Sequence, residues 1–167
     1  MLMQKYPDMS FAIEQSFPFR DTYADALPLG PLMELNARND QNTFTAERAS
    51  ESLDYWRNAA QQIFSDVEAA SSEYVLKSYS HDASIAANLL AAHNFDSQAE
   101  ETYRLATQLW PGNPECVGGL ASLLAANGRQ TEAQQLMDNF SKQYPDQRKA
   151  VENIAGWKVV GAAPGTK

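Results

Sequence analysis

The sequence predicts an all-α fold made of stacked helical hairpins, preceded by a short irregular or extended N-terminal segment. Two observations predict it. Apolar residues recur at helical spacing from about Thr45 onward, and the stretch Leu89–Pro111 returns in altered form as Leu123–Pro145, 34 residues later. The 167 residues, 44% hydrophobic and 20% charged, are long and apolar enough to fold as one domain.

Residues 1–44 are predicted to form an extended or irregular segment that packs on the helices. Met9, Phe11 and Ile13 alternate with smaller or polar residues, which favours a short half-buried strand. Residues Pro31–Leu35 can supply a second strand. The intervening stretch of residues 17–31 contains several prolines and Gly30, so we expect an ordered but irregular loop there.

Residues 45–79 are predicted to form the N-terminal helices. Thr45 is a suitable N-cap, and Glu47 falls in the first turn, where the helix dipole favours an acidic residue. A second helix begins at about Ser72 and can continue without a break into the first copy of the repeated stretch. The first helix is predicted to run to about residue 67 with one apolar stripe, formed by Leu53, Trp56, Ala60, Ile63, Phe64 and Val67.

The repeated stretch pairs small residues and helix breakers at an offset of 34. The pairs are Ala87 with Ala121, Ala99 with Ala133, and Pro111 with Pro145, while Asn94 and Gly128 share the turn position, where both tolerate positive φ. Small residues let two helices approach closely, and each proline ends a helix.

In these features, residues 80–147 resemble two tetratricopeptide repeats, one spanning 80–113 and the other 114–147. The resemblance implies hairpins in a right-handed superhelical stack. Gly118 and Gly119 are expected to weaken the second repeat by roughly 1 kcal/mol each relative to alanine. Residues 148–157 are predicted to form a capping helix, and residues 158–167 a frayed tail.

A second resemblance rests on four short motifs, namely Phe17-Pro18, Leu27–Met33, Asp54-Tyr55-Trp56 and the helices from Ser80 onward. With these, the chain is similar to the soluble C-terminal region of bacterial polytopic membrane proteins related to protein O-mannosyltransferases, an uncharacterised-domain family. The resemblance implies an accessory region of a membrane-embedded glycosyltransferase-like protein. It carries over no catalytic residue.

Composition and spacing argue against several kinds of function. A net charge of -8 repels nucleic acid and anionic membranes, and the apolar run of residues 83–92 is too short to cross a bilayer. Cys116 is the only cysteine, which excludes an internal disulfide and a Cys-rich zinc site. His81 and His93 stand twelve residues apart, which is not the spacing of a helical metal pair. We therefore predict no catalytic, cofactor-binding or metal-binding residue.

The function that the sequence favours is a non-catalytic scaffold module that binds a protein or peptide. Stacked hairpins present a rigid surface, and the first helix of each pair lines its groove. Five residues are predicted to line it: His81, Ser84, Asn88, Glu115 and Ser122. Five aromatic residues are expected mainly in the core, where any exposed one would mark a partner surface: Trp56, Tyr74, Tyr103, Trp110 and Tyr144.

Overall fold

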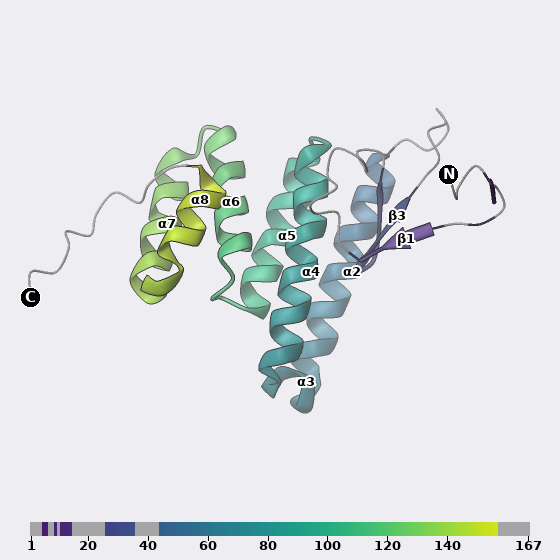
Figure 1. Ribbon diagram of the computed structural model, residues 1–167, viewed down its shortest axis with the longest axis horizontal. Coiled ribbons are helices and arrows are strands. Elements are labelled where there is room, and N and C mark those ends of the chain that lie inside the picture. The colour runs from purple at the N-terminus through teal and green to yellow at the C-terminus, as the bar shows by residue number, and fades with distance from the viewer. Residues whose placement is uncertain (1–4, 7–8, 10, 15–25, 36–43, 157–167) are drawn as a thin grey trace, which may run out of the picture.

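The computed structural model describes residues 5–6, 9, 11–14, 26–35 and 44–156, and over this part the chain is mostly helical with a small antiparallel sheet. The helices follow one another in a row, with the sheet at the N-terminal end (Figure 1). A single 3₁₀ turn, Pro145–Gln147, lies between the last two of the described helices. The α-helices are α2 (Ala46–Ser65), α3 (Val67–Ser71), α4 (Glu73–Ala92), α5 (Asp96–Leu109), α6 (Pro114–Ala126), α7 (Gln130–Gln143) and α8 (Arg148–Ala155).

The sheet has three strands, β1 (Phe11–Ile13), β2 (Leu27–Leu29) and β3 (Leu32–Leu35), in the order β1-β3-β2. Both predicted strands are confirmed as β1 and β3. The prediction of an irregular loop over residues 17–31 is wrong at Leu27–Leu29, which form β2. Residues 17–25 of that loop, which include the motif Phe17-Pro18, fall outside the described residues. Pro28 is compatible with β2 because β2 is an edge strand, where a proline need not donate to a neighbour.

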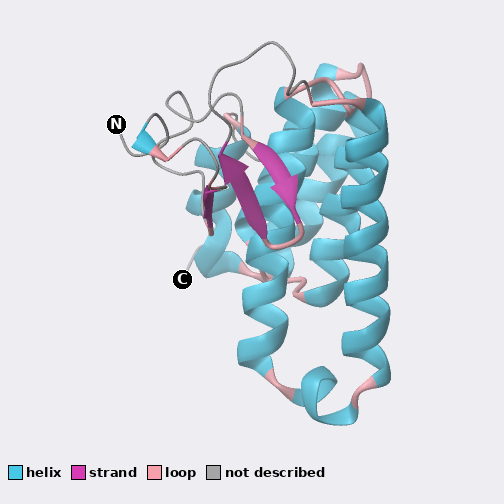
Figure 2. Cartoon of the chain, turned by 90° about the vertical axis from the view of Figure 1, so that its right-hand side faces the viewer, coloured by secondary structure: helices cyan, strands magenta, loops and turns pink. Residues whose placement is uncertain are grey.

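The β2–β3 hairpin covers one side of α4. Its two-residue connection begins with Gly30 at φ 60°, a conformation that this turn position requires and glycine adopts at little cost. Met33 and Ala26 are buried against Ile85 of α4. Figure 2 shows the strands lying across the helices at this end of the molecule.

The helices α2 and α4 form a long hairpin with α3 at its tip (Figures 1 and 2). Thr45 is confirmed as the N-cap of α2, because its side chain accepts a hydrogen bond from the Arg48 backbone N–H at 3.3 Å. The second predicted helix is confirmed as well, since α4 begins after the N-cap Ser72 and runs unbroken to Ala92.

The apolar stripe predicted for α2 is buried from Leu53 to Ile63 but is wrong at its end. Phe64 is 49% exposed and Val67 is 84% exposed. Phe64 still belongs to α2, but it follows the buried Ile63 and lies about 100° further round the helix, outside the buried face. Val67 lies beyond a break in the helix at Asp66, whose carboxylate accepts hydrogen bonds from two backbone N–H groups of α3 and starts a new helix there. Val67 therefore belongs to α3 and leaves the buried face of α2.

Helix boundaries in the C-terminal half recur with the spacing of the sequence repeat. The helices α5 and α7 begin at residues 96 and 130 and end at 109 and 143, while α4 and α6 end at 92 and 126. The predicted turn positions are confirmed, with φ 64° at Asn94 and 78° at Gly128. All four paired alanines, Ala87, Ala121, Ala99 and Ala133, are buried.

The helix α8 continues the same register. It begins at residue 148, as α6 begins at residue 114, and it is followed by its C-cap Gly156, whose φ is 79°. A Cβ atom at Gly118 would lie 2.7 Å from Cγ2 of Ile154, so this glycine permits α8 to pack directly on α6. The predicted capping helix is thus confirmed as a helix up to residue 155, while the predicted tail lies outside the described residues.

Candidate protein-interaction surfaces

Three of the five predicted groove residues come together between α4 and α6. Nδ1 of His81 lies 2.8 Å from Oε2 of Glu115, its counterpart in the second repeat. Ser84 donates from Oγ to the His81 carbonyl oxygen at 2.7 Å and to Glu115 at 3.4 Å. Ser84 is fully buried, so the prediction that it faces a partner is wrong. His81 and Glu115 remain partly exposed.

The other two groove residues have different surroundings. Asn88 is exposed, and its Oδ1 accepts a hydrogen bond of 2.6 Å from the Tyr103 hydroxyl. Ser122 donates to the carbonyl oxygens of Gly118 and Ala155, at 2.9 and 3.3 Å. The predicted groove is therefore closed at Ser122, because α8 packs on that part of α6. Its open part lies along α4 and the start of α6.

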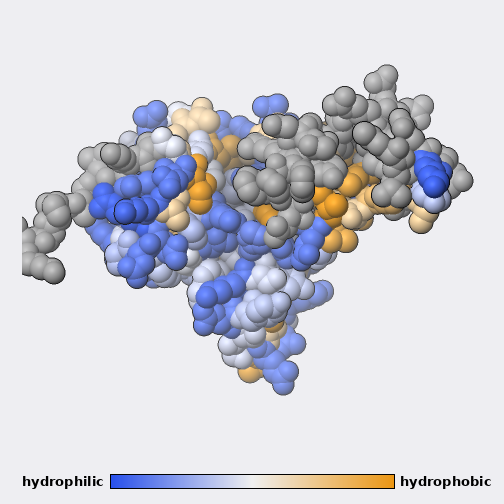
Figure 3. All heavy atoms as spheres, viewed as in Figure 1, coloured by the Kyte–Doolittle hydropathy of each residue, from blue (hydrophilic) through white to orange (hydrophobic). Residues whose placement is uncertain are grey.

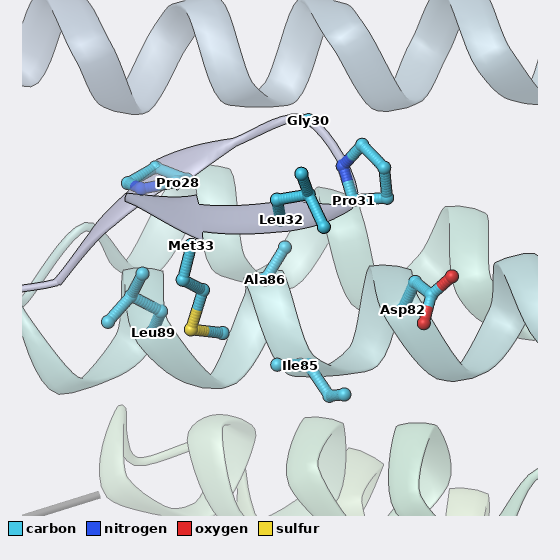
Figure 4. Close-up of a pocket in the computed structure, with 9 residues that line it drawn as sticks. All are labelled: Pro28, Gly30, Pro31, Leu32, Met33, Asp82, Ile85, Ala86 and Leu89. Carbon is cyan, nitrogen blue, oxygen red and sulfur yellow. The ribbon is translucent and has the colours of Figure 1, made fainter. Parts of the chain in front are cut away.

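A small hollow, open to solvent, lies between the β2–β3 hairpin and α4 (Figure 4). Apolar side chains from both elements form most of its wall, and Asp82 stands at one end of the α4 side (Figure 4). Leu29 and Leu32 on the hairpin are exposed nearby. The lining residues are Pro28, Gly30, Pro31, Leu32, Met33, Asp82, Ile85, Ala86 and Leu89.

Asp82 is the charged group of this hollow. Burial raises the pKa of the Asp82 carboxyl, the nearby His81 lowers it by a smaller amount, and the negative charge of Glu14 raises it further. Among the described residues, no hydrogen bond or ion pair is made by the Asp82 carboxylate. The pKa of the neighbouring Tyr55 is also raised, first by burial and then by the charges of Tyr79 and Asp82. Within the described part of the chain, Asp82 is thus a partly desolvated carboxylate without a hydrogen-bond or ion-pair partner.

A second apolar surface lies at the tip of the α2–α4 hairpin. Tyr74 is 81% exposed, so its predicted place in the core is wrong. Trp56 and Tyr103 are buried as predicted, and Trp110 and Tyr144 are half-buried. With Phe64 and Val67, Tyr74 places large side chains in solvent at this end; Figure 3 shows apolar surface there and beside the sheet, separated by mostly hydrophilic surface.

Another set of ionisable groups serves contacts between helices. Glu100 of α5 accepts from Arg104 and from Arg129 beside α7, at 2.7 and 2.6 Å, and both arginines also contact Glu132. These arginines lower the pKa of the Glu100 carboxyl, overcoming the opposite effect of its desolvation.

Cys116 lies inside the fold. Burial raises the pKa of its thiol to about 12. In the part of the chain that the structure describes, no group of three or more His, Cys, Asp or Glu residues could hold a metal ion.

Sequence reasoning missed Asp82 as a candidate site residue. The available signal was an acidic residue preceding the apolar run Ala83–Ala92, on a helix side that the strands cover. The sequence of α4 alone does not show which element covers this side of the helix. The covering strand β2 was itself predicted as loop.

Comparisons with family models, with curated proteins and with solved structures found no match for this chain. Both resemblances inferred from the sequence therefore stay predictions. Among the described helices, none is long and apolar enough to cross a membrane.

Proposed function

We propose that the chain is a protein-binding scaffold module of the tetratricopeptide type, which acts without catalysing a reaction. The observation that carries the proposal is the recurrence of helix boundaries from α4 to α8 with the spacing of the sequence repeat, together with buried alanines at the paired positions. An array of this kind orders an extended surface in advance, so a partner can bind with little further loss of conformational entropy.

The open part of the α4–α6 face is the proposed contact surface. His81 and Glu115 hold each other at 2.8 Å, and the Tyr103 hydroxyl holds Asn88 at 2.6 Å. Polar groups fixed in this way can still exchange hydrogen bonds with a partner, because His81, Asn88 and Glu115 retain exposed surface. Fixed side chains lose less rotamer freedom on binding than free ones.

Site-specific photo-crosslinking tests the proposal. A benzophenone amino acid is placed at Ala92, an exposed residue one turn beyond Asn88 on the same side of α4, and in a matched variant at Gln108, exposed on α5. We expect a defined crosslinked species from position 92 but not from position 108. The crosslinked protein is then purified and its affinity for the wild-type chain is measured by calorimetry.

A His81→Ala variant is expected to weaken that affinity, with folding checked by circular dichroism. The proposal is wrong if position 92 yields no adduct beyond those of position 108. It is also wrong if the purified candidate does not bind the wild-type chain.

A further inference from the structure

The hollow beside α4 combines apolar walls with a charged side chain. Its walls are mainly apolar, from Pro28, Met33, Ile85 and Leu89, yet it keeps the Asp82 carboxylate partly desolvated and without a partner among the described residues. Withdrawing a carboxylate from water costs free energy unless a hydrogen bond or an opposite charge compensates. A ligand with a cationic head and an apolar stem would supply that compensation.

The geometry points to an arginine side chain of a protein partner as the occupant of this hollow, with its guanidinium on Asp82 and its aliphatic stem against the apolar walls. This inference rests on the proposed protein-binding function and names the partner chemistry that one surface recognises. The exposed Leu29 and Leu32 provide apolar surface for the residues that flank the arginine.

Size and charge select this occupant. The hollow is open to solvent and encloses room for only about one water molecule, so it does not surround a small-molecule ligand, but a side chain can lie along its apolar surface. The charge of Glu14 acts on Asp82 with the same sign, so the local field favours a cation. A single carboxylate among apolar groups does not make a metal site, and a second copy of a chain with net charge -8 would be repelled.

Arginine fits this surface better than lysine. Its guanidinium is planar, can donate two hydrogen bonds to one carboxylate, and loses less hydration on burial than a lysine ammonium. Pro31 and the aliphatic residues of the hollow offer flat apolar surface on which such a plane can stack. The lysine ammonium, a strongly hydrated point charge, would gain less from the same walls.

Nuclear magnetic resonance titration of the full chain tests the inference with defined probes. Nα-acetyl-arginine-N-methylamide is added at millimolar concentration and compared with the citrulline analogue, which has the same shape without the charge, and with the lysine analogue. We expect weak binding of the arginine probe, on the order of millimolar. Its shifts should be confined to the β2–β3 hairpin and residues 82–89, with lysine weaker and citrulline without effect.

Two variants sharpen the test. Asp82→Asn keeps the side-chain shape and is expected to weaken arginine binding about tenfold, since the lost contact is a hydrogen bond to a charged group. Asp146→Asn makes the same charge change at an exposed residue of the 3₁₀ turn and should leave the affinity unchanged. Saturation with the arginine probe should also lower the pKa of the Asp82 carboxyl, measured from its ¹³C shift.

Several outcomes would overturn the inference. These are equal shifts with citrulline, tighter binding of the lysine probe, shifts located away from the hollow, or an Asp82→Asn variant that binds as the wild type does. The result is separable from the test of the proposed function. Partner crosslinking from position 92 together with a failed arginine titration would reject the arginine site alone, and the reverse combination would reject the contact surface on α4 and α6.

Discussion

The replacement Gly119→Ala tests how closely α5 packs on α6. A Cβ atom at position 119 would lie 2.6 to 2.7 Å from three atoms of the Tyr103 side chain, including its hydroxyl oxygen. Real contacts of a Cβ atom are not this short, so the ring would have to move. Tyr103 is only 2% exposed, and its hydroxyl donates to Asn88 at 2.6 Å. The ring therefore has little space into which it can move.

Two opposing effects set the magnitude. Alanine is better than glycine inside a helix by about 1 kcal/mol. Overpacking a closed core costs about 1 to 3 kcal/mol, and losing the hydrogen bond between Tyr103 and Asn88 adds about 1 kcal/mol. We therefore expect Gly119→Ala to lower the free energy of unfolding by about 1 to 3 kcal/mol, although helix propensity alone predicts an increase.

Urea unfolding followed by circular dichroism measures the effect, and a double-mutant cycle assigns it. In a Tyr103→Ala background the ring is absent, so the same Gly119→Ala change should be neutral or stabilising, with a coupling energy of about 1 kcal/mol or more. A gain of about 1 kcal/mol from Gly119→Ala in the otherwise wild-type chain would show that Tyr103 does not pack against α6. The reasoning about this helix seam would then be refuted.

Three further predictions follow from single residues. Because the pKa of Asp82 is raised in the folded chain, Asp82→Asn should increase the free energy of unfolding at pH 7. This gain should disappear below the ordinary carboxyl pKa of 3.8, where Asp82 is protonated in both the folded and the unfolded state, and equal gains at pH 3 and pH 7 would contradict the prediction. Asn94, at φ 64°, should lose about 1 kcal/mol of unfolding free energy when changed to alanine but not when changed to glycine, measured by urea unfolding; similar losses from both changes would argue against the left-handed turn. Cys116, whose thiol pKa is raised to about 12 by burial, should react with Ellman's reagent at pH 8 only at the rate of unfolding, and immediate reaction would show that it is accessible.

The repeated part of the fold was predictable because its signals are local. Alanine at 87 and 121, proline at 111 and 145, and a residue tolerant of positive φ at the turn each act within one helix or one turn. Such signals survive without knowledge of the surroundings. Helix boundaries with the spacing of the sequence repeat are consequently confirmed from α4 to α7.

Several errors arise where a distant element decides the outcome, unlike the error at Val67, which follows from the local helix break at Asp66. From the sequence, Gly118 and Gly119 are only weak helix formers, but in the fold their missing side chains leave room for Ile154 and Tyr103. The strand β2 was missed because a proline such as Pro28 is tolerated in an edge strand but not in a central one. Whether a strand lies at the edge depends on the order of strands in the sheet, which the local sequence does not show. Ser122 was placed in an open groove because the position of α8 was unknown.

The helix α4 shows how one element can serve two surfaces. Successive residues of an α-helix point about 100° apart. His81 meets Glu115 on α6, whereas the next residue, Asp82, lines the hollow beneath the β2–β3 hairpin. A further helix packed over that side would bury Asp82 completely, with no partner for its charge. The narrow hairpin packs its own Met33 on Ile85 but leaves the Asp82 carboxylate partly exposed at the edge, so a cation can reach it from solvent.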